Sequence, residues 1–383
     1  MNTLHVVPTK GVEQPLGKRV FGLDALRAIA ICNVLHQHGY FFFDQLVDRE
    51  LWHAPVLVDG VTLFFVLSGF LIGRILFAEQ VQGRLRNFGD LLHFWKRRWW
   101  RTLPAYFLVL LIVIAAAMIN GYSMPDWLWR YFLFLQNLAW PHPGFFGEAW
   151  SLCVEEWFYL FLPITLLMIA RGRPARKPNV LLLAIAVFIL GPLALKQWQI
   201  THALEIDKID SHFRMIVVNR MDNLMFGVTA AWMAVFRTTL WQRSRLIGLL
   251  AGIALLLLIK LKGLLLGHSQ WFEIMALHDL QSVGILLCLP WFSTWHPDRF
   301  AGFTKPIVYL ATISYSLYLV NFALVQLNLM PLLPERMNGI TQVSWQRSMV
   351  PLFVFWCMSI GLASMLYFGF ERPMTALRDR SPG

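Results

Sequence analysis

Charged side chains are scarce in this 383-residue chain: Asp, Glu, Lys and Arg make up 14% of it, whereas hydrophobic residues make up 57%. The mean hydropathy is +0.55. Because soluble globular proteins carry about 25% charged residues, the composition excludes a soluble protein of this size. A membrane-spanning helix needs about 20 apolar residues, so the chain has enough for roughly ten spans and leaves little for an aqueous domain.

Cysteine is scarce as well. The four cysteines all lie within apolar runs, and they are Cys32, Cys153, Cys288 and Cys357. This placement argues against a disulfide framework and against a zinc site, so we predict no metal. The first twenty residues are polar and lack a short apolar stretch followed by small residues. We therefore expect that no signal peptide is removed.

Acidic residues are fewer than basic ones, 22 against 33. In a soluble protein this excess would suggest a nucleic acid partner, but in a membrane protein Lys and Arg set the orientation, and we predict no nucleic acid partner. If the N-terminus is cytoplasmic, the cytoplasmic segments hold 21 basic residues and the outer loops hold 9; Arg27, Arg74 and Arg220 lie in apolar runs. The densest clusters, at 96–101 and 171–177, then face the cytoplasm. This asymmetry predicts that both termini are cytoplasmic.

The apolar runs predict an all-α, polytopic integral membrane protein with about ten transmembrane helices. They cover residues 22–43, 56–78, 103–120, 149–170, 179–197, 215–236, 246–266, 275–293, 306–329 and 349–370. We expect a cytoplasmic N-terminal segment at 1–21, a transmembrane domain at 22–370 and a cytoplasmic tail at 371–383. The aromatic stretch 127–140 is compatible with a short interfacial or re-entrant helix.

The first predicted helix carries Arg27 and His38. An ionisable side chain within a span costs a few kcal/mol and therefore tends to face a protein interior or a watery cavity. Eleven helical steps bring Arg27 and His38 to within roughly 20° of one azimuth, about 16 Å apart along the axis. His36 lies about 200° from His38, so the two imidazoles cannot chelate one metal. The alternative for His38 is an interfacial histidine bonded to a carbonyl.

The fourth predicted helix places Ser151, Glu155 and Tyr159 on one face, with Glu156 displaced by about 100°. Carboxylates in such a group can orient or deprotonate a hydroxyl. The alternative is that both glutamates complement the positive end of the helix dipole. Candidate partners for the glutamates lie at the outer end of the sixth helix, where a structural ion pair is equally compatible; they are Arg220 and Asp222.

Two further motifs are candidates for ligand binding. Ser68 and Gly69 lie within the second helix, where a glycine permits close approach of a ligand or of another helix. Arg98 and Arg101 lie one helical turn apart in a basic, aromatic segment and can clamp a phosphate. A cluster that binds lipid headgroups is the alternative for the two arginines.

Taken in order, seven segments resemble the membrane acyltransferase family 3, whose members move acyl groups from acyl-CoA to hydroxyls of carbohydrates and other acceptors. The segments are residues 23–30 with His38, residues 64–71, Arg98 with Arg101, residues 150–159, residues 220–224 with Gly227, residues 313–319 and residues 370–373. Two departures stand out. The chain has Val320 and Asn321 where the family often has a histidine, so we assign no titrating role there. A fused hydrolase-like domain, present in some relatives, is not found, so we expect the chain either to act alone or to rely on a separate acceptor-side protein.

The resemblance implies a division of roles. His38 is implied to be catalytic, either as a general base or as a transient acyl carrier, and both remain open. Arg27 would orient the donor or stabilise negative charge on the thioester oxygen. Glu155 or Glu156 would position the acceptor or hold the tautomer of the imidazole. The donor contacts would be Arg98, Arg101, Ser68 and Gly69, and the acceptor contacts would be Tyr159, Arg220 and Asp222.

The resemblance thus implies an O-acyltransferase of the bacterial inner membrane. Acyl-CoA, by default acetyl-CoA, is the co-substrate, and we expect no permanently bound cofactor. The acceptor would be a hydroxyl of a glycan or glycolipid at the extracytoplasmic side, and the remaining partner is membrane lipid. One alternative is a transporter or channel for an anionic solute, which also has internal arginines and many helices. A second is a non-catalytic scaffold in polysaccharide export.

Overall fold

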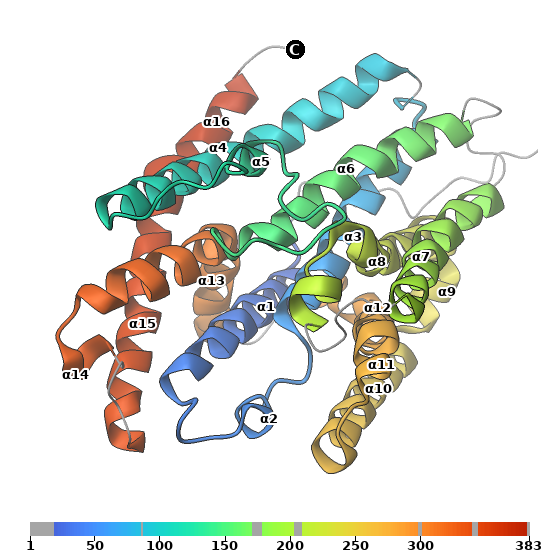
Figure 1. The fold of residues 1–383 in the computed structure, drawn as a ribbon. Helices are drawn as coiled ribbons and strands as arrows, with labels where there is room; N and C mark the ends of the chain where they lie inside the picture. The colour runs from blue at the N-terminus through green and yellow to red at the C-terminus, as the bar shows by residue number, and fades with distance from the viewer. Residues whose placement is uncertain are drawn as a thin grey trace, which may run out of the picture.

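The computed structural model describes residues 19–85, 87–170, 178–202, 209–297, 301–338 and 344–380. Within these residues every regular element is a helix (Figure 1). The long helices are α1 Phe21–Gly39, α3 Gly60–Val81, α4 Phe88–Ile119, α6 Ala149–Ala170, α7 Pro178–Thr201, α8 Val217–Phe236, α10 Arg245–Leu266, α12 His278–Phe292, α13 Ala301–Val320 and α15 Trp345–Leu366.

Shorter elements connect or extend the long helices. Four are π-helical: η2 Asp210–Arg214, η3 Glu273–Leu277, η4 Asn321–Leu329 and η6 Tyr367–Glu371. The others are η1 Tyr40–Phe42, α2 Arg49–Trp52, α5 Trp129–Phe132, α9 Thr238–Arg243, α11 Gln270–Phe272, η5 Met330–Leu332, α14 Glu335–Asn338 and α16 Arg372–Arg380. The aromatic stretch 127–140 thus contains one helical turn, α5, and is otherwise built mainly of turns.

The prediction of an all-α, polytopic membrane protein is confirmed. All ten predicted runs coincide with helices, and eight helical segments in the described residues are long and apolar enough to cross a membrane. The two that fall short, α1 and α8, are interrupted by polar side chains. The orientation of the termini stays a prediction, and the basic cluster at 171–177 lies outside the described residues.

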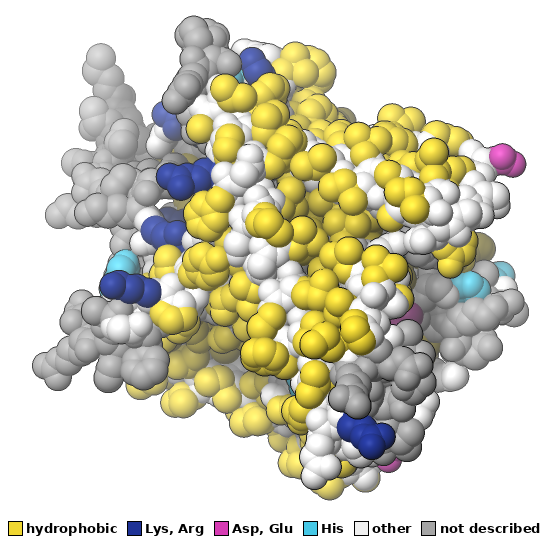
Figure 2. Space-filling model, turned by 90° about the vertical axis from the view of Figure 1, so that its left-hand side faces the viewer, with side chains coloured by type: hydrophobic (Ala, Val, Ile, Leu, Met, Phe, Trp, Pro, Cys, Tyr) yellow, Lys and Arg dark blue, Asp and Glu magenta, His cyan; other side chains and the backbone are white. Residues whose placement is uncertain are grey.

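The polar helices lie inside the bundle. Helix α1 packs against α3 and α13, and α8 packs against α3 and α7, whereas α4 and α10 lie on opposite sides of the molecule (Figure 1). In the most apolar stretch of α3, 72% of the residues are buried inside the protein, whereas in that of α10 only 17% are buried. The polar side chains of α8 at residues 219, 220, 222 and 223 are buried, as is Asp24 of α1, whereas Arg27 and His38 of α1 are half-buried. Figure 2 shows the complementary outer surface, a face covered largely by hydrophobic side chains with basic ones along one edge.

Helices α3 and α8 approach each other through two glycines. A Cβ on Gly69 would lie 1.8 Å from the carbonyl oxygen of Leu224, and a Cβ on Gly227 would lie 2.0 Å from that of Val66. Small residues of this kind allow backbones in membrane bundles to touch. At Gly69 the close approach is therefore that of another helix, α8, and the contact of Gly69 with the acyl donor stays a prediction.

Substitution of Gly69 tests the contact between α3 and α8. We expect Gly69→Ala to lower the melting temperature of the detergent-solubilised protein by several degrees, because the added methyl group forces α3 and α8 apart. Gly191→Ala in α7 is the matched control: no atom lies within 4 Å of its Cβ position, and alanine favours the helix. Equal melting temperatures for the two variants would contradict the close contact.

Candidate active site

His38 lies near the C-terminal end of α1, and its Nδ1 is 2.5 Å from Oδ1 of Asn321. The amide nitrogen of Asn321 donates to the carbonyl oxygens of Leu317 and Tyr318, at 3.0 and 2.7 Å. Because the amide NH2 group is used there, the oxygen faces the imidazole. An oxygen acceptor requires Nδ1 of His38 to carry the proton. The other ring nitrogen, Nε2, is left with its lone pair available for chemistry.

A change in helix type produces this geometry. Helix α13 ends at Val320, which has φ −106° and ψ −20°, and the chain continues as the π-helix η4. At this junction the side-chain amide of Asn321 donates to the carbonyl oxygen of Tyr318. The backbone N–H groups of Phe322 and Ala323 instead donate to Oε1 of Glu148, at 2.9 and 2.7 Å. Single-turn π-helical segments within helices often mark functional sites.

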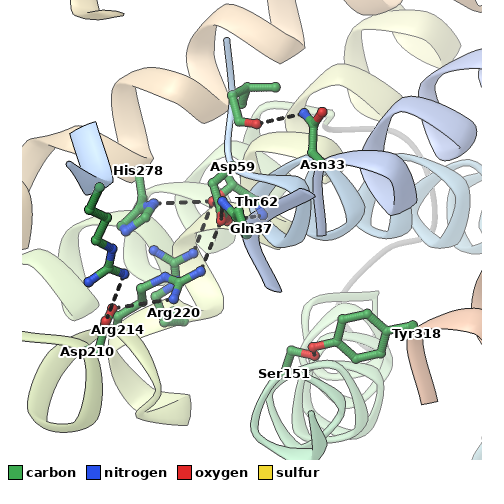
Figure 3. A network of polar contacts seen from close by, with 12 residues as sticks. Asn33, Gln37, Asp59, Thr62, Ser151, Asp210, Arg214, Arg220, His278 and Tyr318 are labelled. Carbon is green, nitrogen blue, oxygen red and sulfur yellow. Dashed lines mark hydrogen bonds and ion pairs between the residues drawn. The ribbon is translucent and has the colours of Figure 1, made fainter. Parts of the chain in front are cut away.

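His38 opens onto a cavity of about 1030 Å³ at this end of the bundle. The cavity lining includes His38, Asp59, Glu148, Trp150, Arg214 and Tyr318. The hydroxyl of Tyr318 lies 2.6 Å from Oγ of Ser151, joining α13 to α6 (Figure 3). A cavity of this size, with aromatic walls and a few converging polar groups, has the character of a ligand pocket.

A buried network around Asp59 forms one wall of the cavity (Figure 3). The carboxylate accepts from Gln37 at 3.1 Å, from Arg214 at 3.0 Å and from both the backbone N–H and the hydroxyl of Thr62, at 2.8 and 2.9 Å. Arg220 donates to the same Thr62 hydroxyl at 3.2 Å. Burial raises the pKa of Asp59, but the charge of Arg214 above all outweighs it and holds that pKa well below its usual range. Asp59 is therefore ionised.

Loss of the Asp59 charge should destabilise the protein. Because the folded pKa is depressed, this carboxylate contributes stability above the unfolded value near pH 4 and loses it only as the pH falls further. We expect Asp59→Asn to cost about 3 kcal/mol, since it leaves Arg214 without its closest ion pair. The measurement is thermal unfolding at pH 7. Glu79→Gln, which breaks the more exposed Glu79–Arg84 pair, is the control and should change little; a similar small effect for both would contradict the assignment.

A second cluster lies where α3, α4 and α6 meet, and it contains five of the other predicted residues: Ser68, Arg98, Glu155, Glu156 and Tyr159. Tyr159 is its centre: its hydroxyl donates to Glu155 at 2.5 Å, accepts from Arg98 at 2.5 Å and contacts the Ser68 hydroxyl. The Arg98 guanidinium also lies 4.2 Å from the centre of the Tyr159 ring and 3.5 Å from Glu155. Glu156 accepts from Thr102 at 3.1 Å. This second cluster is the inner polar cluster of the protein.

The two arginines of the predicted phosphate clamp are not equivalent. Helix α4 begins at Phe88, behind an Asn87–Asp90 capping box, so Arg98 and Arg101 lie on one helix as expected. Arg98 is turned inward to Glu155 and Tyr159, whereas Arg101 is exposed. Arg27, from α1, is half-buried and pairs with Asp24 at 3.1 Å. None of these three arginines lines the described wall of the His38 cavity.

Two expected pairings do not occur among the described residues. Arg220 and Asp222 do not meet the glutamates of α6: Asp222 binds Lys196 at 2.9 Å, and Lys196 also reaches Asp279 at 3.4 Å. Glu155 and Glu156 belong to the inner polar cluster instead of holding the tautomer of His38, which is held by Asn321. The alternative for Arg220 and Asp222, a structural polar network, fits these contacts.

The sequence did not point to three residues that line the cavity, Asp59, Glu148 and Arg214, or to Asn321, which holds His38. In the sequence, Asn321 stands out only as a replacement for histidine, and Glu148 and Arg214 lie in connecting segments without periodicity. The available signal was proximity to a recognised motif: Glu148 precedes residues 150–159, Arg214 precedes residues 220–224, and Asn321 follows residues 313–319. Within the residues that the structure describes, no group of three or more His, Cys, Asp or Glu side chains could hold a metal ion.

The fold and the cavity define a multi-pass membrane protein with a candidate acid–base site in its interior. The model of the family described as an acyltransferase domain matches residues 20–369, so the chain belongs to acyltransferase family 3. A relative from Staphylococcus aureus strain COL, which carries the provisional name O-acetyltransferase, is 25% identical over 343 residues. The protein named O-acetyltransferase OatA, from Staphylococcus aureus strain NCTC 8325, is 24% identical over 339 residues.

Each of these alignments covers 79% of this chain and 50% of the relative. The chain thus spans about half the length of the curated relatives it matches. No solved structure gives a significant match to the chain.

Proposed function

We propose that this protein is an O-acyltransferase that moves an acyl group, by default acetyl, from acyl-CoA to a hydroxyl of a glycan or glycolipid. Membership of the acyltransferase family supports the reaction class, and the His38–Asn321 hydrogen bond at the cavity is the observation that carries it. A neutral imidazole with its proton fixed on Nδ1 is a general base or a nucleophile at Nε2. The transmembrane domain at 22–370 would perform the whole reaction.

In the general-base route, Nε2 of His38 takes the proton of the acceptor hydroxyl while its oxygen attacks the thioester carbonyl carbon. The tetrahedral intermediate collapses, the C–S bond breaks, and the proton passes from His38 to the departing thiolate of CoA. In the acyl-carrier route, Nε2 itself attacks the thioester carbonyl carbon, the C–S bond breaks and CoA leaves as the thiolate. The oxygen of the acceptor hydroxyl then attacks the acyl carbon, the bond from that carbon to Nε2 breaks, and the hydroxyl proton passes by way of Nε2 to the thiolate. Both routes use the same atom, so the geometry supports either.

The donor would enter from the other end of α1, which we propose to be cytoplasmic. Exposed Arg101 and half-buried Arg27 are the cations available to its phosphates, while Glu155 and Tyr159 hold Arg98 in place behind them. Arg27 and His38 are separated by about 16 Å along the helix, which is the scale of an extended pantetheine arm. Ser68 lies between the two ends on α3. The acceptor would reach His38 from the extracytoplasmic side of a bacterial cytoplasmic membrane.

Replacement of His38 tests the function. Purified protein in proteoliposomes should release free CoA thiol from acetyl-CoA in the presence of hexose glycosides, and His38→Ala should reduce that rate at least about a hundredfold. Insertion and melting temperature should stay unchanged.

His36→Ala is the matched control, because His36 lies two residues away on the same helix, bonds the carbonyl of Trp52 and does not line the cavity. Full turnover by His38→Ala would reject the assignment. Uptake of an anionic solute by a wild-type protein that consumes no acetyl-CoA would favour the transporter instead.

Replacement of Asn321 tests how the imidazole is oriented. We expect Asn321→Ala to lower kcat about tenfold or more while leaving the KM for acetyl-CoA unchanged, because Nδ1 of His38 loses the acceptor that fixes its tautomer. The control is Asn328→Ala, since Asn328 lies in the same π-helix but bonds the carbonyl of Ala323. An unchanged kcat in Asn321→Ala would show that the hydrogen bond has no part in the reaction.

A further inference from the structure

Glu148 is a buried carboxyl group with only one of its oxygens occupied. It precedes α6 directly, is 3% exposed and lines the same cavity as His38. Its Oε1 accepts the two N–H groups at the start of η4, at 2.9 and 2.7 Å. Its Oε2 is buried and has no hydrogen-bond partner among the described residues. A buried polar atom without a partner is costly, so the free oxygen calls for an explanation.

The same turn of η4 fixes both Glu148 and His38. Asn321 holds the imidazole, and the next two residues, Phe322 and Ala323, hold the carboxyl group. The ring of Phe322 packs beside His38, with the two ring centres 4.8 Å apart, and a Cβ on Gly147 would lie 2.8 Å from the edge of the Phe322 ring. Three consecutive residues thus contact both His38 and Glu148, and both of these side chains line one cavity.

The remaining charges on the cavity wall define what can bind. Arg214 is paired with both Asp59 and Asp210, and Arg49 lies 3.7 Å from Asp210. Nζ of Lys260 donates to the carbonyl of His53 at 2.6 Å. The carboxyl groups of Glu148, Glu50 and Glu273 also line the cavity. With its main cation already neutralised and carboxyl groups in excess, this wall disfavours an anionic ligand.

We propose that Oε2 of Glu148 binds a hydroxyl of the acceptor adjacent to the one that reacts at His38, so that the cavity selects a neutral polyhydroxylated acceptor, a sugar ring. This assignment rests on the proposed acyltransferase function. One hydroxyl gives its proton to Nε2 of His38 while its neighbour is held by Glu148, and the rings of Trp150 and Tyr318 line the cavity where the sugar would lie. Burial raises the pKa of Glu148 to about 7, although the N–H groups of Ala323 and Phe322 lower it. The group can therefore accept or donate a hydrogen bond near neutral pH.

Glu148→Gln separates this role from a structural one. The amide oxygen can still accept the N–H groups of Phe322 and Ala323, so η4 and His38 keep their places, while Oε2 is replaced by an NH2 group. The assay uses purified protein in proteoliposomes with acetyl-CoA and methyl glycosides of glucose, glucosamine and glucuronic acid. For wild type we expect the neutral glucoside to be acylated with the highest kcat/KM and the glucuronide with the lowest.

In the variant we expect the KM for the glucoside to rise about tenfold, because a charge-assisted hydrogen bond is lost, with the KM for acetyl-CoA and the melting temperature unchanged. Monodeoxy glucosides sharpen the test: removal of one hydroxyl should raise the KM of wild type but not that of Glu148→Gln. Glu79→Gln is the control substitution of a carboxyl group, since Glu79 lies outside the cavity and pairs with Arg84, and it should behave as wild type.

Three results would overturn the assignment. A wild-type KM for the glucoside in Glu148→Gln would show that Oε2 does not bind the acceptor. A lower melting temperature together with a raised KM for acetyl-CoA would show a structural role only. Acylation of none of the glycosides by wild type would overturn the proposed function itself, which distinguishes that failure from a failure of Glu148.

Discussion

The switch from α-helix to π-helix at Asn321 is the constraint on which the candidate site depends. In a continuous α-helix the carbonyl of Tyr318 would accept the N–H of Phe322, and no donor would be left for Glu148. The wider turn frees two backbone N–H groups, which Glu148 takes, and turns the amide of Asn321 so that its oxygen meets His38. In a membrane interior these groups must be satisfied within the protein. Glu148 and the side chain of Asn321 satisfy these groups at the irregular turn, and the same arrangement holds the imidazole of His38 in place.

Helix α3 connects two of the polar groups in the bundle, the Asp59 network and the inner polar cluster. Thr62, near the start of the helix, belongs to the Asp59 network at the cavity, whereas Ser68 belongs to the inner polar cluster. Gly69 lets α8 approach closely enough for Arg220 to reach Thr62. Close packing at the glycines thus keeps lipid away from the polar side chains. Without lipid around them, these charges can be buried at a lower free-energy cost.

Much of the fold can be predicted from the sequence, because each membrane span is a continuous apolar run of residues. The sequence also predicts that Arg27 and His38 share one face of α1 and that Glu155 contacts Tyr159, since both depend only on helical periodicity. Contacts between side chains of different helices cannot be predicted from the sequence in this way. The partner of Glu155 is Arg98 and not Arg220, and nothing local distinguishes the two arginines. Glu148 lies in no pattern at all, because its partners are backbone groups at Phe322 and Ala323, far along the chain.

Helix α4 has 32 residues, which corresponds to a length of about 48 Å. The hydrocarbon layer of a bilayer is about 30 Å thick, so α4 must tilt or project into the headgroup region at the end that carries Arg98 and Arg101. Lipid chain length then sets how deeply this pair sits relative to water. In a thicker bilayer the two arginines would lie closer to the acyl chains, and in a thinner one they would lie closer to water. The position of this end of α4 therefore depends directly on membrane thickness.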